Sequence, residues 1–383
     1  MQNGIYLPPD RTTPPLNNAA ATPTDHPMDA QHVPPPPTSL EHLSSVMENS
    51  PRFRALDSLP VKHQAMYQNV VTYYVNENSN FQTNPRLTSN PALRDHLVGL
   101  IRQVYGRSAI LFALDVEAWE LNTHVVTEIG IAIYDPRDQQ VSLVPSTTQI
   151  HIRIKENMDK VNGRYVPNHA TNFIGDATYV MTQADAAMFT QSLVNYYFGK
   201  IRLTGYACYL VGHDLKGDLQ WMNSLGVSFP LEYQVMDTNH LFRISHGNTN
   251  ISLKRALLGV GIPYAYLHNA GNDAYYTLLL AMKLCDPQSR TRYALDVFVP
   301  SKNVPPPMTE EERVVYDKEK KEKKEAKRQA RLEAKARGEK YVPPKQDQQD
   351  NAPKRKKKKG PKAATCESIE LDSALEAARI IFG

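Results

Sequence analysis

The chain has 383 residues and three cysteines, which are too few and too widely spaced for a disulfide framework or a zinc site. No apolar run approaches the roughly 20 residues of a membrane span, and no basic-then-apolar leader opens the chain, so we expect a soluble, intracellular protein without membrane contact. Residues 301–383 contain 22 Lys and Arg against 15 Asp and Glu, which leaves 22 against 25 for residues 1–300, so the basic character lies in the tail.

The first 106 residues divide into two segments. Residues 1–58 are rich in proline, with Pro34 to Pro37 among Asn, Thr and Ala, and such a composition cannot bury enough apolar surface to offset chain entropy. We therefore expect residues 1–58 to be disordered. Residues 59–106 are expected to form a helical arm with one helix from about Val61 to Val75, an Asn-rich loop, and a second helix from Pro91 to Tyr105.

From residue 107 to residue 300, apolar strand patterns alternate with helical ones, which predicts an α/β domain. The expected strands cover 110–117, 125–134, 150–154, 208–211 and 235–237, and the expected helices cover 182–198, 214–226, 252–258 and 272–285. The strand at 150–154 reads I-H-I-R-I, an alternation that suits a strand with one exposed face. This order of elements predicts one mixed sheet flanked by helices.

The basic tail, residues 301–383, contains three features. Thr309 and Glu312 form a capping box for a solvated Glu/Lys/Arg/Ala helix over 309–337. The run from Lys354 to Lys359 is either a solvated disordered stretch or a nuclear import signal and nucleic-acid contact. The last segment, Ile369 to Phe382, is amphipathic and is expected to dock on a partner or on the domain itself.

Two acids at the end of the first apolar strand are the first sign of a functional site. Asp115 and Glu117 are alternate strand residues and therefore project from the same face. Carboxylates held this close repel each other unless a cation or a proton lies between them. Alone, this pair could also be a strand-end turn.

Two further acidic motifs lie at strand-to-helix junctions, where ligand sites of α/β sheets tend to lie. In the first, Asp218 follows Gly212-His213-Asp214; we expect Asp214 to be a helix cap and His213 to pack at the junction, both outside the site. In the second, His268 precedes Asp273 by five residues, which would place the two on different faces of a helix. They converge only if His268 lies in the preceding loop, which Gly271 as a turn residue and Asn272 as a cap favour.

Asp-x-Glu at a strand end, an Asp after Gly-His at a helix start, and His-x-x-x-x-Asp at the last helix are similar to the three motifs of DEDDh-type 3′-to-5′ exonucleases of the ribonuclease H-like superfamily. The resemblance covers about residues 108–284, and H-N-A-G-N-D looks most like a fungal subgroup linked to RNA metabolism and mRNA export. It implies a ribonuclease H-like sheet in which four carboxylates bind metal and a histidine is the general base: Asp115, Glu117, Asp218 and Asp273, with His268.

The second motif departs from the family pattern. Relatives often carry Asn and an aromatic residue where this chain has Asp214 and Gly217. Neither position is a metal ligand in the family, so the departure concerns strand binding and rate. Because Gly217 costs roughly 1 kcal/mol relative to Ala inside a helix, we expect close packing against it.

The residues themselves support the same chemistry. Carboxylate ligands without cysteine select Mg²⁺ or Mn²⁺, and two such ions about 3.5 to 4 Å apart can hold the attacking water and the leaving 3′-oxygen of a phosphodiester. His268, with a reference pKa near 6.5, suits removal of the water's proton, and Glu117 is expected to contact the terminal 3′-hydroxyl.

We therefore expect a metal-dependent 3′-5′ exonuclease in the nucleus, the cytoplasm or both. Its substrate is expected to be single-stranded nucleic acid, RNA rather than DNA from the resemblance. The basic tail would raise the local concentration of substrate and could contact ribonucleoproteins or import receptors. Two alternatives stay open: a nuclease-like module that binds RNA or ribonucleoprotein with little catalysis, and a DNA-directed repair exonuclease.

Overall fold

The computed structural model describes residues 39–50, 53–54, 65–141, 143–247, 250–300 and 366–382, with isolated residues between 318 and 337. The cluster at 354–359 and most of the helix expected over 309–337 lie outside these residues. The described residues belong to one compact unit. Among them, no helix is both long and apolar enough to cross a membrane.

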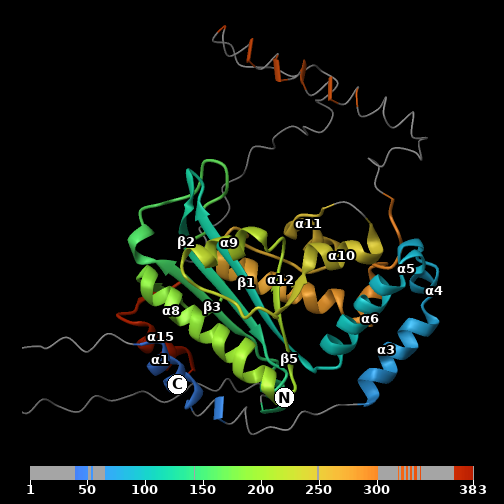
Figure 1. Cartoon of the computed structure of the whole chain (residues 1–383), viewed down its shortest axis with the longest axis horizontal. Coiled ribbons are helices and arrows are strands. Elements are labelled where there is room, and N and C mark those ends of the chain that lie inside the picture. Colours follow the sequence, from blue (N-terminus) through green and yellow to red (C-terminus); the bar gives the residue numbers. More distant parts are fainter. Residues whose placement is uncertain are drawn as a thin grey trace, which may run out of the picture. The chain divides into compact units, whose positions relative to one another are not determined.

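A seven-stranded mixed sheet forms the centre of this unit, in the order β6-β5-β1-β2-β3-β4-β7 (Figure 1). The strands are β1 Ala109–Trp119, β2 Asn122–Tyr134, β3 Thr148–Ile154, β4 Thr178–Met181, β5 Ala207–Gly212, β6 Gln234–Asp237 and β7 Ser368–Glu370. The pairs β1/β2 and β2/β3 are antiparallel, and the other neighbours are parallel. The predicted mixed sheet flanked by helices is confirmed, and β4 and β7 are strands that the sequence pattern did not indicate.

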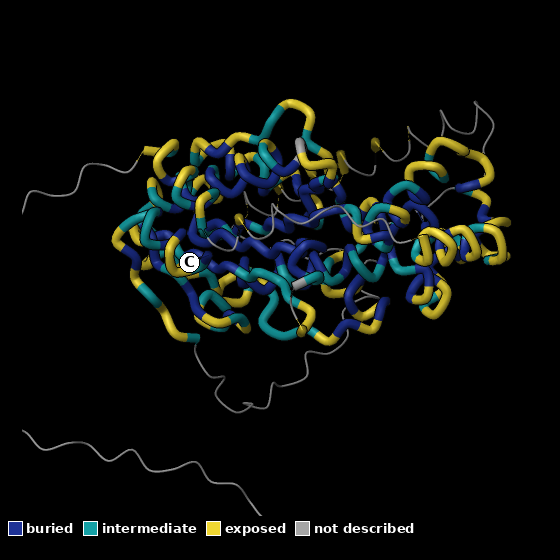
Figure 2. Tube along the Cα trace, turned by 90° about the horizontal axis from the view of Figure 1, so that it is seen from below, coloured by how far each residue is buried: buried dark blue, intermediate teal, exposed yellow. Residues whose placement is uncertain are grey.

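Helices cover both faces of the sheet. They are α1 Leu40–Glu48, α3 Ala65–Glu77, α4 Ser79–Gln82, α5 Pro85–Ser89, α6 Pro91–Tyr105, α7 Asp138–Val141, α8 Gln183–Val194, α9 Lys216–Ser224, α10 Thr238–His246, α11 Leu253–Gly259, α12 Ala270–Leu284, α13 Pro287–Arg292 and α15 Ala374–Phe382. A π-helical stretch, Asn195–Lys200, continues α8, and 3-10 turns cover Lys155–Asn157 and Ile201–Thr204. Figure 2 shows the buried residues gathered in the middle, with exposed residues along the outer sides of the helices.

Strand β1 contributes to the apolar cores on both faces. Because successive strand residues point to opposite faces, Ile110 and Phe112 belong to the core that includes α8 and α15, whereas Leu111 and Ala113 belong to the core that includes α6 and α12. All four side chains are fully buried. Burial on both sides explains why this strand is a continuous apolar run in the sequence.

The N-terminal helices pack on the sheet as part of the same unit. The expected Asn-rich loop contains the short helices α4 and α5, whose caps are Asn78 and Asn84. The Asn84 side-chain amide also donates to the carbonyls of Ser245 and Asp296, both at 2.8 Å. Asp296 further accepts from the buried Arg290 guanidinium at 2.5 Å, and the Tyr74 hydroxyl of α3 joins the same cluster. These contacts tie the arm to the end of the domain.

The expected disorder of residues 1–58 is wrong for the described residues at 39–50 and 53–54. Leu43 and Met47, one helical turn apart on α1, are buried in the core, and the Phe53 ring lies 5.0 Å from the Phe382 ring of α15. The average composition of residues 1–58 is proline-rich and polar, so the short apolar face of α1 was not recognised in the sequence. The C-terminal segment docks on the domain: α15 packs beside α1, and β7 pairs with β4 from Thr178 to Val180.

Candidate metal centre

The C-terminal part of strand β1 contains the two acids of the first motif. Asp115 pairs with Gly130 across to β2, and Glu117 pairs with Glu128. On its other side β1 pairs with β5 only as far as Ala113, so the following residues have no strand neighbour there. The space is taken by a side chain from α9: Asp218 Oδ1 accepts a hydrogen bond from the backbone N–H of Val116 at 2.8 Å.

Asp218 reaches this position from the first turn of α9 and is 8% exposed. Asp214 does not cap that helix, contrary to expectation. Its side chain is exposed, and its backbone has a positive φ of 71°. The residue before α9 is Leu215, which has no capping side chain. Asp237 at the end of β6 holds the turn before the helix, because its Oδ2 accepts from the N–H groups of Asp214 at 3.1 Å and Leu215 at 3.3 Å.

His213 packs at the junction, as predicted. Its Nδ1 lies 2.8 Å from Thr238 Oγ1, and its Nε2 lies 2.7 Å from the carbonyl oxygen of Ile251. Both ring nitrogens are therefore occupied by structural contacts. Gly217 meets the expected close packing, because a Cβ there would lie 3.3 Å from the ring of Trp221, one turn later on α9. The Trp221 indole N–H donates to the carbonyl of Thr123, which fixes the ring in that place.

His268 lies in the loop before α12, as predicted, with a φ of 71°. The helix cap is Asn269 rather than Asn272: the Asn269 side chain accepts from the Asn272 N–H at 3.0 Å. The Asn272 side chain is instead buried, and its carboxamide bonds the N–H of Ile174 in the loop before β4. Asn is a favoured N-cap residue, and both positions lie at the start of the helix, so the sequence alone did not show which Asn caps it.

This loop brings the third motif onto the first. The His268 backbone N–H donates to Asp273 Oδ2 at 3.0 Å, and His268 Nδ1 lies 3.9 Å from Glu117 Oε1. Ligand atoms of Glu117, His268 and Asp273 all lie within 4.8 Å of one another. The second carboxylate oxygen of Asp273, Oδ1, is buried without a hydrogen-bond partner. An orphaned buried oxygen beside two more donors is the arrangement that a bound cation would satisfy.

A glycine on β2 allows α12 to begin so close to the sheet. A Cβ on Gly130, which lies directly opposite Asp115, would come within 1.9 Å of the carbonyl oxygen of Ala270. No side chain can occupy that position unless the start of α12 moves. The separation of Asp273 from the acids of β1 is therefore set by the absence of a side chain at Gly130.

Electrostatics show that the acids form one cluster. Burial, together with the charges of Asp273, Asp218, Glu117 and Glu128, raises the pKa of Asp115 well above its usual value. Burial and neighbouring carboxylates raise the pKa of Glu117 to about 8. Burial is also the main cause that raises the pKa of Asp273 to about 7 and the pKa of Asp218 to about 6. A cluster of buried acids that resists ionisation is typical of a cation site.

His268 has the opposite character. Its side chain is about half exposed. Burial of the remainder, with the nearby charges of His169 and Lys254, lowers its pKa below the usual value. The imidazole is therefore neutral at pH 7 and able to accept a proton.

Three residues that support the site were not predicted. Glu128 Oε2 lies 2.9 Å from His151 Nε2 and accepts from the N–H of Ala270 at 3.2 Å, while the Asn269 side-chain nitrogen lies 3.3 Å from the same imidazole nitrogen. His151 was expected on an exposed face of its strand but is fully buried, because the start of α12 covers this part of the sheet. The signal in the sequence was a lone glutamate within an apolar strand, V-V-T-E-I-G-I.

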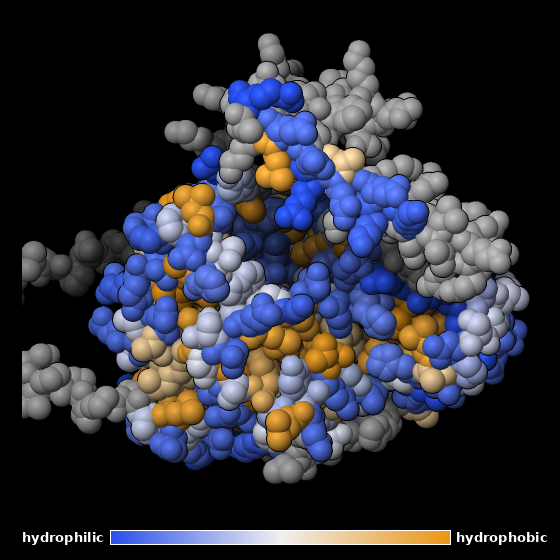
Figure 3. All heavy atoms as spheres, turned by 45° about the horizontal axis from the view of Figure 1, so that its top comes forward, coloured by the Kyte–Doolittle hydropathy of each residue, from blue (hydrophilic) through white to orange (hydrophobic). Residues whose placement is uncertain are grey.

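The structure thus brings all five predicted site residues to one place at the C-terminal end of β1: Asp115, Glu117, Asp218, His268 and Asp273. Strand β1 provides Asp115 and Glu117, the N-terminal ends of α9 and α12 provide Asp218 and Asp273, and the loop before α12 provides His268. Figure 3 views the molecule from the side that forms the top of Figure 1, where hydrophilic side chains surround a hollow.

Known proteins match the same region. Residues 110–284 match the model of the DEDDh family described as "DNA polymerase III subunit epsilon-like, C-terminal domain". The Saccharomyces cerevisiae protein "Good for full DBP5 activity protein 2" is 38% identical over 224 residues, which are 52% of this chain and 40% of that protein. An uncharacterized nucleolar protein of Schizosaccharomyces pombe is 32% identical over 180 residues, which are 44% of this chain and 66% of that protein. The matches thus span about two fifths to two thirds of these relatives.

Two solved structures are similar over about half of this chain. One is the Pan2 pseudoubiquitin hydrolase-RNA exonuclease module of S. cerevisiae in complex with AAGGAA RNA, at 18% identity and a TM-score of 0.29, covering 49% of this chain and 32% of that one. The other is Escherichia coli exonuclease I in complex with a dA16 oligonucleotide, at 12% identity and a TM-score of 0.31, covering 48% of this chain and 42% of that one. The sequence matches carry the likeness, and the superpositions do not. By those matches, residues 110–284, which hold the acidic cluster, are similar to the DEDDh exonuclease family and to the yeast protein "Good for full DBP5 activity protein 2".

Proposed function

We propose that this domain is a metal-dependent 3′-5′ exonuclease that hydrolyses phosphodiesters of single-stranded nucleic acid, with RNA preferred over DNA. The observation that carries the proposal is the buried, unpartnered Oδ1 of Asp273, on a carboxylate that has an oxygen within 4.8 Å of ligand atoms of Glu117 and His268. A buried acid in this state is costly to ionise by itself. The cost is recovered when a cation occupies the cluster.

Four carboxylates would hold the metal: Asp115, Glu117, Asp218 and Asp273. An all-oxygen donor set without cysteine suits Mg²⁺ or Mn²⁺, and four acids supply enough negative charge for two ions. When bound, such ions make a water molecule more acidic and neutralise charge that develops on the phosphate. The raised pKa values of these acids fit this role, because each is relieved by a neighbouring positive charge.

The remaining chemistry belongs to His268 and Glu117. His268 is neutral at pH 7 because its pKa is lowered, and its half-exposed imidazole can take a proton from an attacking water. Its backbone N–H is bonded to Asp273, so the imidazole is held at the acidic cluster. The Glu117 side chain remains 18% exposed and can accept a hydrogen bond from the hydroxyl at a strand end. A contact of this kind would favour a free 3′ terminus over an internal phosphodiester.

The proposal is tested with 5′-labelled oligonucleotides of one sequence, made as RNA and as DNA, each with a free or a phosphorylated 3′ end. With Mn²⁺ or Mg²⁺, the wild-type protein should shorten the RNA with a free 3′ end stepwise, shorten the DNA more slowly, and leave the blocked strands intact. Chelation with EDTA should stop the reaction. The variants Asp115→Ala and Asp273→Asn should lose activity, and His268→Ala should lose about 10²- to 10⁴-fold in rate.

Asp95→Asn is the matched control, because it makes the same Asp-to-Asn change as Asp273→Asn on an exposed side chain of α6, outside the cluster. It should retain the wild-type rate. Activity that persists in both Asp115→Ala and Asp273→Asn would overturn the site assignment. Binding of RNA without any shortening would favour the adaptor function, in which the fold and the tail assemble ribonucleoprotein without turnover.

We further propose that the protein acts in the nucleus. The relative from S. pombe is named as a nucleolar protein, and the basic cluster at 354–359 has the composition of an import signal. Fluorescent tagging of the full chain, with and without Lys354 to Lys359 replaced by Gln, measures this directly. Equal distribution of both forms between nucleus and cytoplasm would contradict the proposal.

A further inference from the structure

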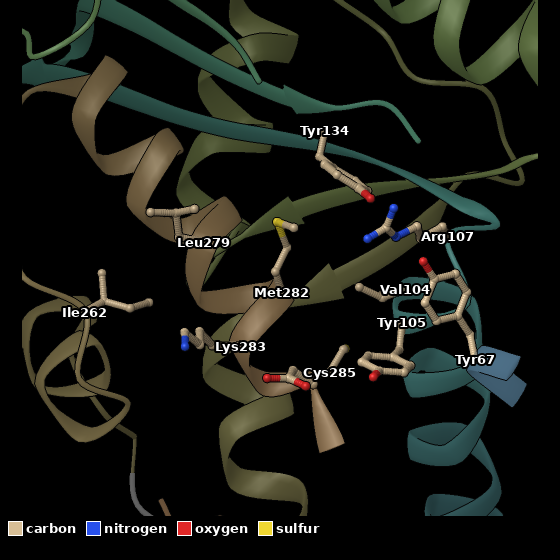
Figure 4. A pocket seen from close by; sticks show the side chains of 11 residues that line it. Tyr67, Val104, Tyr105, Arg107, Tyr134, Ile262, Leu279, Met282, Lys283 and Cys285 are labelled. Atoms are coloured by element: carbon tan, nitrogen blue, oxygen red, sulfur yellow. The ribbon is translucent and has the colours of Figure 1, made fainter. Parts of the chain in front are cut away.

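A cavity of about 410 Å³ lies between α3, α6, the end of β2 and the last turn of α12 (Figure 4). This volume falls within the range of about 300 to 1,000 Å³ that small-molecule sites occupy. Lys283 at the cavity and Asp273 at the acidic cluster are ten residues apart on α12, which corresponds to about 15 Å along a helix. The cavity is therefore separate from the proposed nuclease site.

Three tyrosine side chains form much of the lining: Tyr67, Tyr105 and Tyr134. The rings of Tyr67 and Tyr105 meet edge to face, with centroids 5.7 Å apart. In the part of the chain that the structure describes, none of the three hydroxyls has a hydrogen-bond partner. The cavity thus offers flat aromatic surfaces for a planar ring and phenol groups able to bond polar atoms at its edge.

Two cations face the same space. The guanidinium carbon of Arg107 lies 5.1 Å from the centre of the Tyr67 ring, and Figure 4 shows this side chain between Tyr134 and Tyr67. Lys283 lines the opposite side, on α12. Over the described ranges, neither cation forms an ion pair. The acid at the rim, Asp286, is engaged in capping α13, where it accepts from the N–H groups of Gln288 and Ser289.

The backbone of Arg107 is a second, independent observation. Arg107 follows α6 with a φ of 56°, in the left-handed region where glycine is favoured, and Gly106 directly precedes it. Backbone hydrogen bonds close this turn: the N–H groups of Gly106, Arg107 and Ser108 donate to the carbonyls of Arg102, Val104 and Gln103. Glycine at 107 would keep all three bonds without strain, so the turn does not account for a long cationic side chain there.

From these observations we propose that the cavity binds a nucleotide, with the base stacked among the tyrosine rings and the phosphate held by Arg107 and Lys283. Aromatic surfaces select a planar ring, the two cations select an anion, and a nucleotide combines both groups. The apolar floor formed by Ile262, Leu279 and Met282 suits the base rather than the phosphate. The ligand is either a free nucleoside monophosphate or one nucleotide within a strand, and the site does not depend on nuclease activity.

The test is binding in EDTA, so that no metal supports the acidic cluster. AMP, adenosine and inorganic phosphate are titrated separately into the full chain and followed by calorimetry and by the rise in melting temperature. A 3′-phosphorylated oligoadenylate is the second arm, in which strand nucleotides replace the free one. We expect AMP or the oligonucleotide to bind, and adenosine and phosphate to bind at least tenfold more weakly than AMP where AMP binds.

Arg107→Gly is the informative variant, because it removes the cation while relieving the backbone strain. It should weaken binding at least tenfold while keeping or raising the melting temperature of the free protein, and Lys283→Gln should weaken binding as well. Arg94→Gln is the matched control: Arg94 lies over the Phe81 ring in the same arm, 5.5 Å from its centre, but outside the cavity.

Loss of AMP binding in Arg107→Gly would identify a free nucleotide as the ligand, and loss of oligonucleotide binding alone would identify a strand. Unchanged binding in Arg107→Gly would overturn the proposal, as would the absence of binding by either ligand. Loss of binding in Asp115→Ala with full binding in Arg107→Gly would place the ligand in the acidic site instead. Nuclease assays with Mn²⁺ are read separately, so failure of this proposal and failure of the nuclease proposal are distinguishable.

Discussion

Replacement of Glu117 by glutamine should stabilise the metal-free protein and do so only at high pH. The folded pKa of about 8 lies above the ordinary value of 4.5. A carboxyl group whose pKa is raised by folding binds its proton more tightly in the folded state, so the free energy of unfolding falls as the pH rises from about 4.5 to about 8. The ionised carboxylate therefore destabilises the folded state, and the neutral amide of glutamine does not.

The magnitude follows from the same shift. At about 1.36 kcal/mol per pKa unit, ionisation of Glu117 at pH 8 costs the fold about 4 kcal/mol, and at pH 5 less than about 1 kcal/mol. The Glu117 side chain is 18% exposed, so screening by solvent reduces the cost at pH 8. We therefore expect Glu117→Gln to raise the free energy of unfolding by about 2 to 3 kcal/mol at pH 8. Burial is the main cause of this cost, and repulsion from Glu128 and then Asp273 adds to it.

The assay is urea unfolding in EDTA at pH 5 and pH 8, for wild type and Glu117→Gln. Glu367→Gln is the control, since it makes the same chemical change on an exposed side chain and should alter neither value by more than about 0.5 kcal/mol. Addition of Mn²⁺ at pH 8 should stabilise wild type more than the variant. An equal gain at both pH values, or a loss at pH 8, would refute the electrostatic account of the cluster.

Three further predictions concern the support of the site and of the fold. Gly130→Ala should cost about 2 to 3 kcal/mol in urea unfolding and at least tenfold in Mn²⁺-dependent activity, because the new methyl group would meet the Ala270 carbonyl oxygen and displace the start of α12. Arg290→Met should cost about 3 to 5 kcal/mol, because it leaves Asp296 charged and buried, and the double variant with Asp296→Asn should recover part of that loss; no recovery would contradict the pairing. Phe382→Ala should cost about 3 to 5 kcal/mol and speed hydrogen exchange in α1, whereas the half-exposed Ile380→Ala should cost less than about 1 kcal/mol; equal costs would mean that α15 is not docked.

The central strands and the site were predictable because their signals are local. Strand β1 is buried on both faces, so its sequence is a continuous apolar run. Acids at the end of such a strand are costly to bury unless they bind a partner, which marks them as candidate site residues. The spacing of His268 and Asp273 required a loop before the last helix, and the structure has one. Helix α6 runs from Pro91 to Tyr105, as predicted, because its proline start and its apolar face are both encoded within fifteen residues.

The features that were missed depend on distant partners. Strand β4 has four residues and β7 has three, too few for a periodicity of two to be recognised. His151 is buried only because the loop at Asn269 and the start of α12 cover its strand. Asp214 does not cap α9, and the turn before this helix is held by Asp237, about 20 residues later, a contact that a rule for neighbouring residues does not reveal. Tertiary packing decides such cases, and a single sequence does not display it.

The pairing of β7 with β4 also affects the order in which the protein can be completed during synthesis. Ser368 pairs with Thr178, so 190 residues separate the two partners in the chain. At roughly 5 to 20 residues per second, a ribosome needs about 10 to 40 s to make that interval. Throughout this time the outer edge of β4 has no β7 partner and can pair with another chain. We expect the nascent protein to depend on a chaperone or on dilution during that window, and its solubility to improve when translation is accelerated between residues 180 and 366.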